Sequence, residues 1–373
     1  MTEQGMDPTV MMALTALILP LVGFMMAATP YLMRRGEVFA VTVPTAAQQD
    51  SYLKGLKRRY AAMVAAVSLV LTTATLALAL GGVYAGVIVM LVVGSFAILG
   101  IGYGLMQFYR AKTKAYKHKQ GWVAGAQESV AVVDDQPVPQ VISLKWNLLY
   151  LPIMALTLAI GVLGYAQMPD QIPLQMGFDG SVSRWADKTP LIPFMPVLIQ
   201  GFFGVCLTFS HWTIMRSKKW SEPGAPATSA LAYGMFAHAQ SLYLVVGGLL
   251  IAGAMATMPL TFIGIISMGQ AAIGIMVAAL AMCIGAIAVS VVYGQAGSRV
   301  FLRMQGSDTL LADDDSHWKF GIFYVNRDDP SLFLPERFGV GWTTNWARPA
   351  VWALLVAGLA ITAGFVVAVL VLF

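Results

Sequence analysis

The chain contains 373 residues, of which 58% are hydrophobic and only 11% are charged, and its mean hydropathy is +0.72. Soluble domains carry about 25% charged residues, so this composition excludes an ordinary soluble fold. Disorder would need low hydrophobicity, collagen would need periodic glycine, and a disulfide scaffold would need more than the two cysteines present. We therefore expect an integral membrane protein.

Charge-free runs long enough to cross a bilayer occur eight times along the chain. A hydrocarbon core of about 30 Å requires about 20 apolar residues at about 1.5 Å each. The runs cover residues 11–33, 60–81, 83–109, 147–166, 191–215, 230–257, 260–293 and 349–372. They predict an all-α, polytopic membrane helical bundle with about eight transmembrane helices, the first of them kinked at Pro20.

The basic residues lie almost entirely on one side of this bundle. Of the 23 Lys and Arg residues, six fall in residues 34–59, six in 110–145, three in 216–219 and six in 299–348. The opposite side has only Arg184 and Lys188, so the positive-inside rule predicts an N-out/C-out protein. The net charge of +5 then reflects orientation and attraction to lipid headgroups, and we expect the lipid bilayer as a partner and no nucleic acid.

The loops divide the chain into five predicted regions. These are a three-span region with basic cytoplasmic loops (1–146), a two-span unit with an outside loop at 167–190 (147–215), a two-span helical hairpin (216–293), a cytoplasmic loop with an aromatic motif at 317–345 (294–348), and a last transmembrane helix (349–373). Short turns, at residues 81–83 and around Met258 and Pro259, predict antiparallel helix pairs. We expect function in the two long loops, because long connections in compact chains usually serve a function.

The apolar runs contain no Asp, Glu, Lys or Arg, which disfavours an ion-coupled pump. Within them only His211 and His238 titrate near neutrality. We interpret His211 as an interfacial hydrogen-bonding residue and leave His238 between a helix-packing contact and a functional role. No spacing in the chain is typical of a metal site, a phosphate-binding loop or a serine-hydrolase elbow, so we expect no enzyme, no cofactor and no metal.

The outside loop has its own pattern of turn and aromatic residues. We single out Pro169, Asp170, Pro173, Gly180, Trp185 and Lys188. The prolines stiffen the loop, Gly180 completes a turn signal, and Trp185 suits the headgroup level. The three aspartates of the loop could form a cation site. Because Arg184 and Lys188 are available as partners, we favour a salt-bridged cap over the bundle.

Residues 168–173, with Gly180, Trp185 and Lys188 ahead of an apolar span, resemble the small membrane domain of unknown function found in bacterial sporulation-delaying-protein immunity proteins. The resemblance covers residues 148–196. The chain has Gln175 where that family usually has His, and Ser183 where it usually has an acidic residue. The resemblance implies a non-enzymatic immunity or sensing protein in a bacterial plasma membrane.

The cytoplasmic loop contains a long aromatic motif at residues 317–345, which is similar to a short domain of unknown function found in the same kind of membrane proteins. An aromatic run at 320–325, turn residues at 326–331 and a return at 332–338 predict one β-hairpin. The residues singled out in the motif are Trp318, Tyr324, Asn326, Asp328, Asp329, Pro330, Phe338, Trp342 and Asn345.

Three interpretations of this motif remain open. We favour packing of its aromatic side chains on the bundle or the inner headgroup layer, with Arg327 and Arg337 snorkelling. The second interpretation is a docking surface for a cytoplasmic regulatory protein. In the third, Asp328 and Asp329 form a metal or catalytic pair, although adjacent carboxylates before proline usually form an exposed turn.

Together these patterns favour an immunity, sensing or regulatory membrane protein directed against membrane-active peptides. Its outside loop would bind an extracellular peptide, and its cytoplasmic loops would bind a regulatory partner. The main alternative is a transporter or channel-like protein for an apolar or amphipathic solute, because eight uncharged spans could line a lipid-accessible groove. A membrane-embedded enzyme is the third hypothesis.

Overall fold

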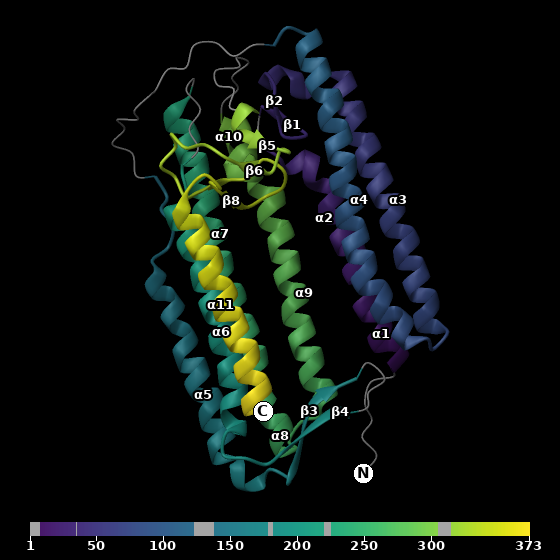
Figure 1. Ribbon diagram of the computed structural model, residues 1–373, viewed down its shortest axis with the longest axis vertical. Coiled ribbons are helices and arrows are strands. Elements are labelled where there is room, and N and C mark those ends of the chain that lie inside the picture. The colour runs from purple at the N-terminus through teal and green to yellow at the C-terminus, as the bar shows by residue number, and fades with distance from the viewer. Residues whose placement is uncertain (1–7, 35, 123–137, 178–181, 220–224, 305–314) are drawn as a thin grey trace.

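The computed structural model describes residues 8–34, 36–122, 138–177, 182–219, 225–304 and 315–373. Within these residues, eight helical segments are long and apolar enough to cross a membrane, which confirms the predicted helical bundle. Two groups of helices stand side by side, and short β-hairpins lie at both ends of the bundle (Figure 1). We name the two ends cytoplasmic and outside according to the predicted orientation.

The first group consists of α1 (Pro8–Ala16), α2 (Ile18–Leu32), α3 (Ser51–Leu80) and α4 (Tyr84–Lys119). The predicted kink is present, because the chain interrupts the helix at Leu17. Pro20 consequently lies in the first turn of α2, where a missing backbone N–H leaves no helical hydrogen bond unmade. α4 continues well beyond its charge-free run and projects from the cytoplasmic end.

A tight hairpin of β1 (Glu37–Val38) and β2 (Val41–Thr42), followed by η1 (Thr45–Gln49), connects α2 to α3. Phe39 and Ala40 have positive φ angles of 48° and 55°, as the short turn between the strands requires. Residues 38–41 are fully buried, and the Phe39 ring lies 5.6 Å from that of Tyr60. The core of the first group therefore includes backbone turns at its cytoplasmic end.

The second group consists of α5 (Tyr150–Leu163), α6 (Met195–Arg216), α7 (Pro226–Met255), α8 (Met258–Ile263), α9 (Met268–Tyr293) and α11 (Pro349–Leu372). The 3-10 turns η2 (Leu144–Leu149) and η4 (Ile192–Phe194) precede α5 and α6. The turn predicted around Met258 and Pro259 is wrong. Pro259 occupies the first turn of α8, and the chain reverses after Gly264, whose φ is +80°.

The outside loop folds as η3 (Tyr165–Gln167) and an antiparallel hairpin of β3 (Gln171–Met176) and β4 (Val182–Asp187). Ile172 is fully buried in a cluster with Met195 and Phe262, so the hairpin covers the end of the second group. The predicted cap is present, and it is built from strands.

The cytoplasmic loop contains η5 (Gln295–Gly297), α10 (Ser298–Met304), η6 (Asp315–His317), β5 (Trp318–Lys319), β6 (Phe323–Tyr324), β7 (Phe333–Pro335) and β8 (Trp342–Thr344). The single predicted hairpin is wrong, because β5 pairs with β6 and β7 pairs with β8. Phe320 and Gly321, with φ of 50° and 73°, already close a turn inside the aromatic run.

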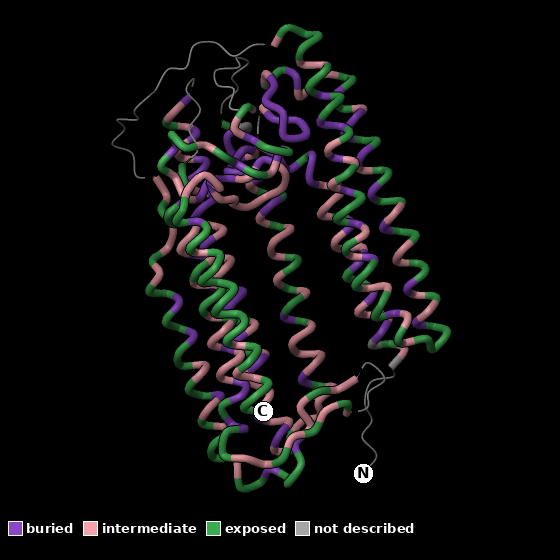
Figure 2. The backbone as a smooth tube through the Cα atoms, in the orientation of Figure 1, coloured by how far each residue is buried: buried purple, intermediate pink, exposed green. Residues whose placement is uncertain are grey.

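Some glycines of the spans allow close packing of neighbouring segments, and others do not. A side chain at Gly161 would meet Pro193 at 3.0 Å, so this glycine does allow close approach. Gly100 and Gly104 have the G-x-x-x-G spacing that predicts close helix packing, but this prediction is wrong, since a side chain at either position would meet nothing within 4 Å. Figure 2 shows that buried residues gather at the cytoplasmic end, whereas the membrane helices carry mainly intermediate and exposed residues, and α11 is largely exposed.

Candidate functional site

The predicted outside residues surround a lysine that is held without an ion pair. The Lys188 ammonium donates a hydrogen bond to the Met168 carbonyl oxygen at 2.7 Å and lies 5.0 Å from the centre of the Tyr165 ring. Its backbone N–H donates to the carbonyl oxygen of Asp170 at 2.8 Å, so that residue contributes its backbone. Within the described part of the chain, no ion pair joins the charged residues of the hairpin, and Asp179, the third aspartate of the predicted salt-bridged cap, lies outside the described residues.

The hairpin has an inward apolar face and an outward face. Ile172 pairs with Ala186 and faces the bundle, while Pro173 pairs with Trp185, whose side chain is 52% exposed. Such a ring at the end of a membrane bundle suits the headgroup layer. Pro169 is also exposed, whereas Gly180 lies outside the described residues.

An apolar groove of about 440 Å³ lies beneath this hairpin, where α1, β3, α8 and α9 converge. Its walls are formed by Thr15, Leu174, Gln175, Met176, Met258, Thr261, Phe262, Met268, Ala271, Ala272, Ile273, Ile275, Met276 and Ala279. Four of these residues are methionines, whose unbranched, polarisable side chains adapt to ligands of different shape. The volume is within the range of small-ligand pockets. Sequence reasoning missed this groove, and the only available signal was the high methionine content.

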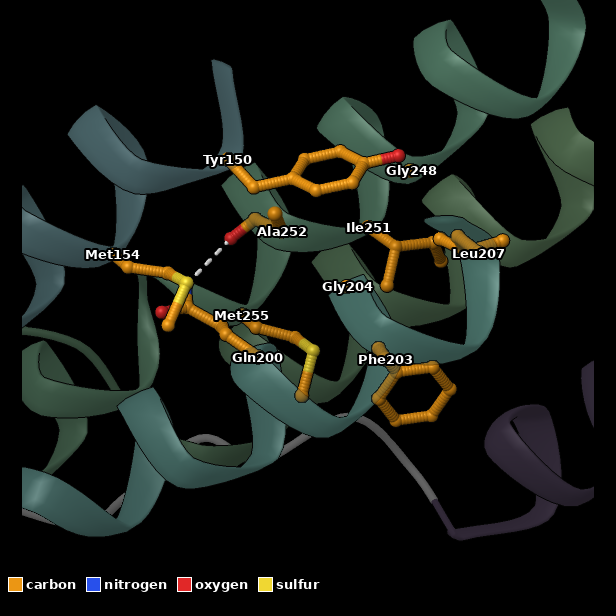
Figure 3. Close-up of a pocket in the computed structure, with 10 residues that line it drawn as sticks. All are labelled: Tyr150, Met154, Gln200, Phe203, Gly204, Leu207, Gly248, Ile251, Ala252 and Met255. Carbon is orange, nitrogen blue, oxygen red and sulfur yellow. Dashed lines mark hydrogen bonds between the residues drawn. The ribbon is translucent and has the colours of Figure 1, made fainter. Parts of the chain in front are cut away.

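A mainly apolar pocket inside the second group is too small for a ligand. Its space of about 10 Å³ holds one water molecule at most. Figure 3 shows Gln200 and Tyr150 within the apolar lining, and Gln200 donates a hydrogen bond to the Ala252 carbonyl oxygen at 2.9 Å. Gln200 also donates to the Thr157 hydroxyl at 2.9 Å, so these polar groups connect α5, α6 and α7.

The two histidines of the spans bind backbone near the cytoplasmic ends. His211 is fully buried between the Asn147 amide at 3.1 Å and the Ile142 carbonyl oxygen at 3.0 Å. This arrangement confirms the hydrogen-bonding interpretation of His211. His238 is exposed and lies 2.7 Å from the Gln140 carbonyl oxygen, a contact that fixes the chain leading to α5.

Four of the predicted cytoplasmic residues converge on one hydrogen-bond network. Asn345 is fully buried and donates to the carbonyl oxygens of Asn326 at 2.7 Å and Asp329 at 3.0 Å. The Tyr324 hydroxyl donates to the Asp329 carboxylate at 3.0 Å, and the Lys218 ammonium forms an ion pair with the same carboxylate at 2.7 Å. This network ties the motif to the end of α6.

The two adjacent aspartates have different surroundings. Asp328 and Pro330 are exposed, whereas Asp329 is buried. Burial opposes ionisation of Asp329, but hydrogen bonds from Lys218 and Ser331 outweigh burial and lower its pKa to about 2. Asp329 is therefore an ionised structural carboxylate.

The aromatic residues of the motif pack on the protein itself. Trp342 stacks on Phe236 of α7 with ring centres 5.3 Å apart, and Phe338 meets Tyr60 of α3 edge-on at 6.4 Å. Trp318 is only 3% exposed and lies 5.2 Å from the Tyr324 ring. The favoured interpretation, packing on the bundle, agrees with these contacts, which connect the motif to both groups of helices.

A buried cluster of charges, missed by sequence reasoning, joins the motif to the first group. Arg337 is fully buried and lies 3.2 Å from the Glu37 carboxylate; it also forms an ion pair with Asp315 and donates to the Thr42 hydroxyl at 3.0 Å. Lys117 of α4 binds Asp315 at 3.0 Å. The prediction that Arg337 snorkels to the headgroups is wrong, because internal carboxylates hold its guanidinium.

Two segments of the chain match families defined by sequence. Residues 153–199, which span α5, the outside hairpin and the start of α6, match a domain of unknown function (DUF1648). Residues 327–352, which include Asp329, Arg337 and Asn345, match a family of unknown function (DUF5808). Comparison with curated proteins and with solved structures gives no match.

Both matches overlap the segments that carried the sequence resemblances, and both concern domains without an assigned activity. The matched segments contain the outside cap and most of the network at the cytoplasmic end. They support a membrane-helical protein with domains of unknown function, and the link to immunity proteins stays a prediction.

Proposed function

We propose that the chain is a non-enzymatic plasma-membrane protein that binds an amphipathic, membrane-active peptide in the groove beneath its outside hairpin. The observation that carries the proposal is the groove itself, with four methionines in its lining and a strand at its rim. Its immunity or sensing role rests on the resemblance of residues 148–196 to immunity proteins.

The lining of the groove favours a peptide as the ligand. Among the described strands β3 pairs with β4 alone, and Leu174, Gln175 and Met176 of β3 line the groove. An extended peptide could add main-chain hydrogen bonds to such an edge while its apolar side chains enter the methionine-rich space. A cytoplasmic regulatory partner would contact Phe320 and Phe323, which are 69% and 40% exposed, since Trp318 is buried.

One observation favours transport as the second candidate. The groove takes Thr15 from α1 of the first group and the rest of its lining from the second group or its cap. A site between two helix groups is where rocking of one group against the other would move a solute. Flux of the ligand into sealed vesicles would distinguish transport from binding alone.

The test uses a synthetic amphipathic peptide, with leucine on one face and lysine on the other, and the full chain in lipid nanodiscs. Ala272→Phe should fill the groove and weaken peptide binding at least tenfold, measured by fluorescence anisotropy. Val277→Phe adds the same ring on α9 at a residue that is 57% exposed, and it should leave binding unchanged. Equal affinities of the wild type and Ala272→Phe would contradict the proposal.

The biological arm uses cells that depend on the chain for survival under peptide challenge. Cells expressing the wild type or Val277→Phe should survive, and cells expressing Ala272→Phe should be sensitive. If all three tolerate the peptide as poorly as cells without the chain, the immunity role is refuted even where binding is observed.

A further inference from the structure

A second cavity of about 440 Å³ lies at the cytoplasmic end, between α4 and the β5 segment. α4 contributes Gln107, Arg110 and Lys114, which are spaced to share one face of a helix. The opposite wall includes Asp315 and Lys319. This cavity belongs to neither the outside groove nor the network around Asn345.

Arg110 is the buried cation of this cavity, with only 5% of its surface exposed. Its Nε has no hydrogen-bond partner, and its Nη2 reaches the Trp318 carbonyl oxygen only at 3.4 Å. In the part of the chain that the structure describes, no carboxylate lies within ion-pair distance of its guanidinium. A buried guanidinium with an unused N–H is costly unless an anion binds it.

The carboxylate in the lining of this cavity already binds other groups. Asp315 lines the cavity, but it forms ion pairs with Arg337 and Lys117 and accepts a hydrogen bond from the Thr42 hydroxyl at 2.7 Å. Lys114 and Lys319, both exposed on the wall of the cavity, add two further positive charges. The cavity therefore carries an excess of positive charge.

We propose that this cavity binds a phosphate-bearing anion through Arg110, Lys114 and Lys319. A guanidinium and two ammonium groups converging on one space are the donors that phosphate oxygens prefer. The site lies where the charge-free run of α4 ends at Tyr109, beside the 69% exposed ring of Phe320, and thus at the predicted headgroup level. The anion is either a soluble phosphate compound or the headgroup of an anionic phospholipid.

The experiment measures the melting temperature of the full chain in neutral detergent. One arm adds inorganic phosphate against potassium chloride of equal ionic strength, and the other adds phosphatidylglycerol against phosphatidylcholine. Ligand that binds only the folded state raises the melting temperature with concentration. Lys114→Gln and Lys319→Gln should each weaken the apparent affinity about tenfold, because each removes a charge-assisted contact.

Lys112→Gln is the matched control. Lys112 lies on the same helix, is exposed, and stands 4.4 Å over the Phe108 ring outside the lining of the cavity. A rise in melting temperature with phosphate identifies a soluble ligand, and a rise with phosphatidylglycerol alone identifies a lipid. Either result supports the site if the Lys112→Gln variant shows the same rise as the wild type. The proposal would be overturned if neither ligand raised the melting temperature, or if Lys114→Gln, Lys319→Gln and Lys112→Gln all lost the same amount of apparent affinity.

Discussion

Arg337→Gln tests whether the buried charge cluster holds the cytoplasmic end together. The substitution keeps a polar side chain of similar length but removes the charge that reaches Glu37 and Asp315. It also removes the donor to the Thr42 hydroxyl at 3.0 Å. Because Arg337 is fully buried, water cannot replace these contacts without opening the cluster.

The structure sets the expected size of the effect. Removing one partner of a buried ion pair costs about 3–5 kcal/mol, because the remaining charge is left uncompensated. Here Glu37 keeps its pair with Arg34, and Asp315 keeps its pair with Lys117 at 3.0 Å. Neither carboxylate is left without a cation, so we expect a loss near the lower limit, about 3 kcal/mol.

Denaturant titration in detergent micelles, followed by tryptophan fluorescence, gives the free energy of unfolding. Arg327→Gln is the control, since Arg327 is exposed in the same motif. In the double variant Glu37→Gln/Arg337→Gln, the combined loss should fall short of the sum of the single losses by at least about 1 kcal/mol. The reasoning fails if the free energy of unfolding of Arg337→Gln is within about 0.5 kcal/mol of that of Arg327→Gln.

Two further predictions concern the same end of the bundle. Burial raises the pKa of Glu336 to about 7, above its ordinary value of 4.5, so the folded state binds its proton more tightly and stability falls as pH rises from about 4.5 past 7. Glu336→Gln should remove that fall, by up to about 3 kcal/mol in unfolding measurements across this range; a pH profile parallel to the wild type would exclude the effect. Asn345→Ala leaves the carbonyl oxygen of Asn326 without its donor and the Asn326 N–H without its acceptor, while the Asp329 carbonyl oxygen keeps a donor in Arg348; it should cost about 2–3 kcal/mol. Its denaturation midpoint checks this, and a midpoint equal to the wild type would show that water replaces the amide.

The membrane helices could be predicted from the sequence, because a charge-free run of sufficient length has one stable conformation in a bilayer. The packing of these helices against one another could not be predicted in the same way. Gly100 and Gly104 have the spacing of a helix contact, but which face of α4 meets another helix depends on the neighbours, and these glycines face away from them. The turn at Phe320 and Gly321, which the predicted single hairpin missed, could have been found locally, since glycine inside a β-prone run often marks a turn.

The candidate sites were harder to predict, because their residues are far apart along the chain. Tyr324, Asp329 and Asn345 share one hydrogen-bond network, and they could be grouped in advance because they lie within a single short motif. The burial of Arg337 could not be predicted, because its partner Glu37 lies far away in the sequence, in the first cytoplasmic loop. The methionine groove likewise combines four elements that only the tertiary fold brings together.

The pairing of Glu37 with Arg337 also sets an order of assembly during synthesis. The β1–β2 hairpin emerges from the ribosome early, yet the guanidinium that reaches its carboxylate is made only after seven of the eight spans. Until then Glu37 lacks this guanidinium, and the early loop stays incompletely buried. A chain that ends before Arg337 would therefore leave the cytoplasmic end of the first helix group unfinished, although all the spans of that group are already made.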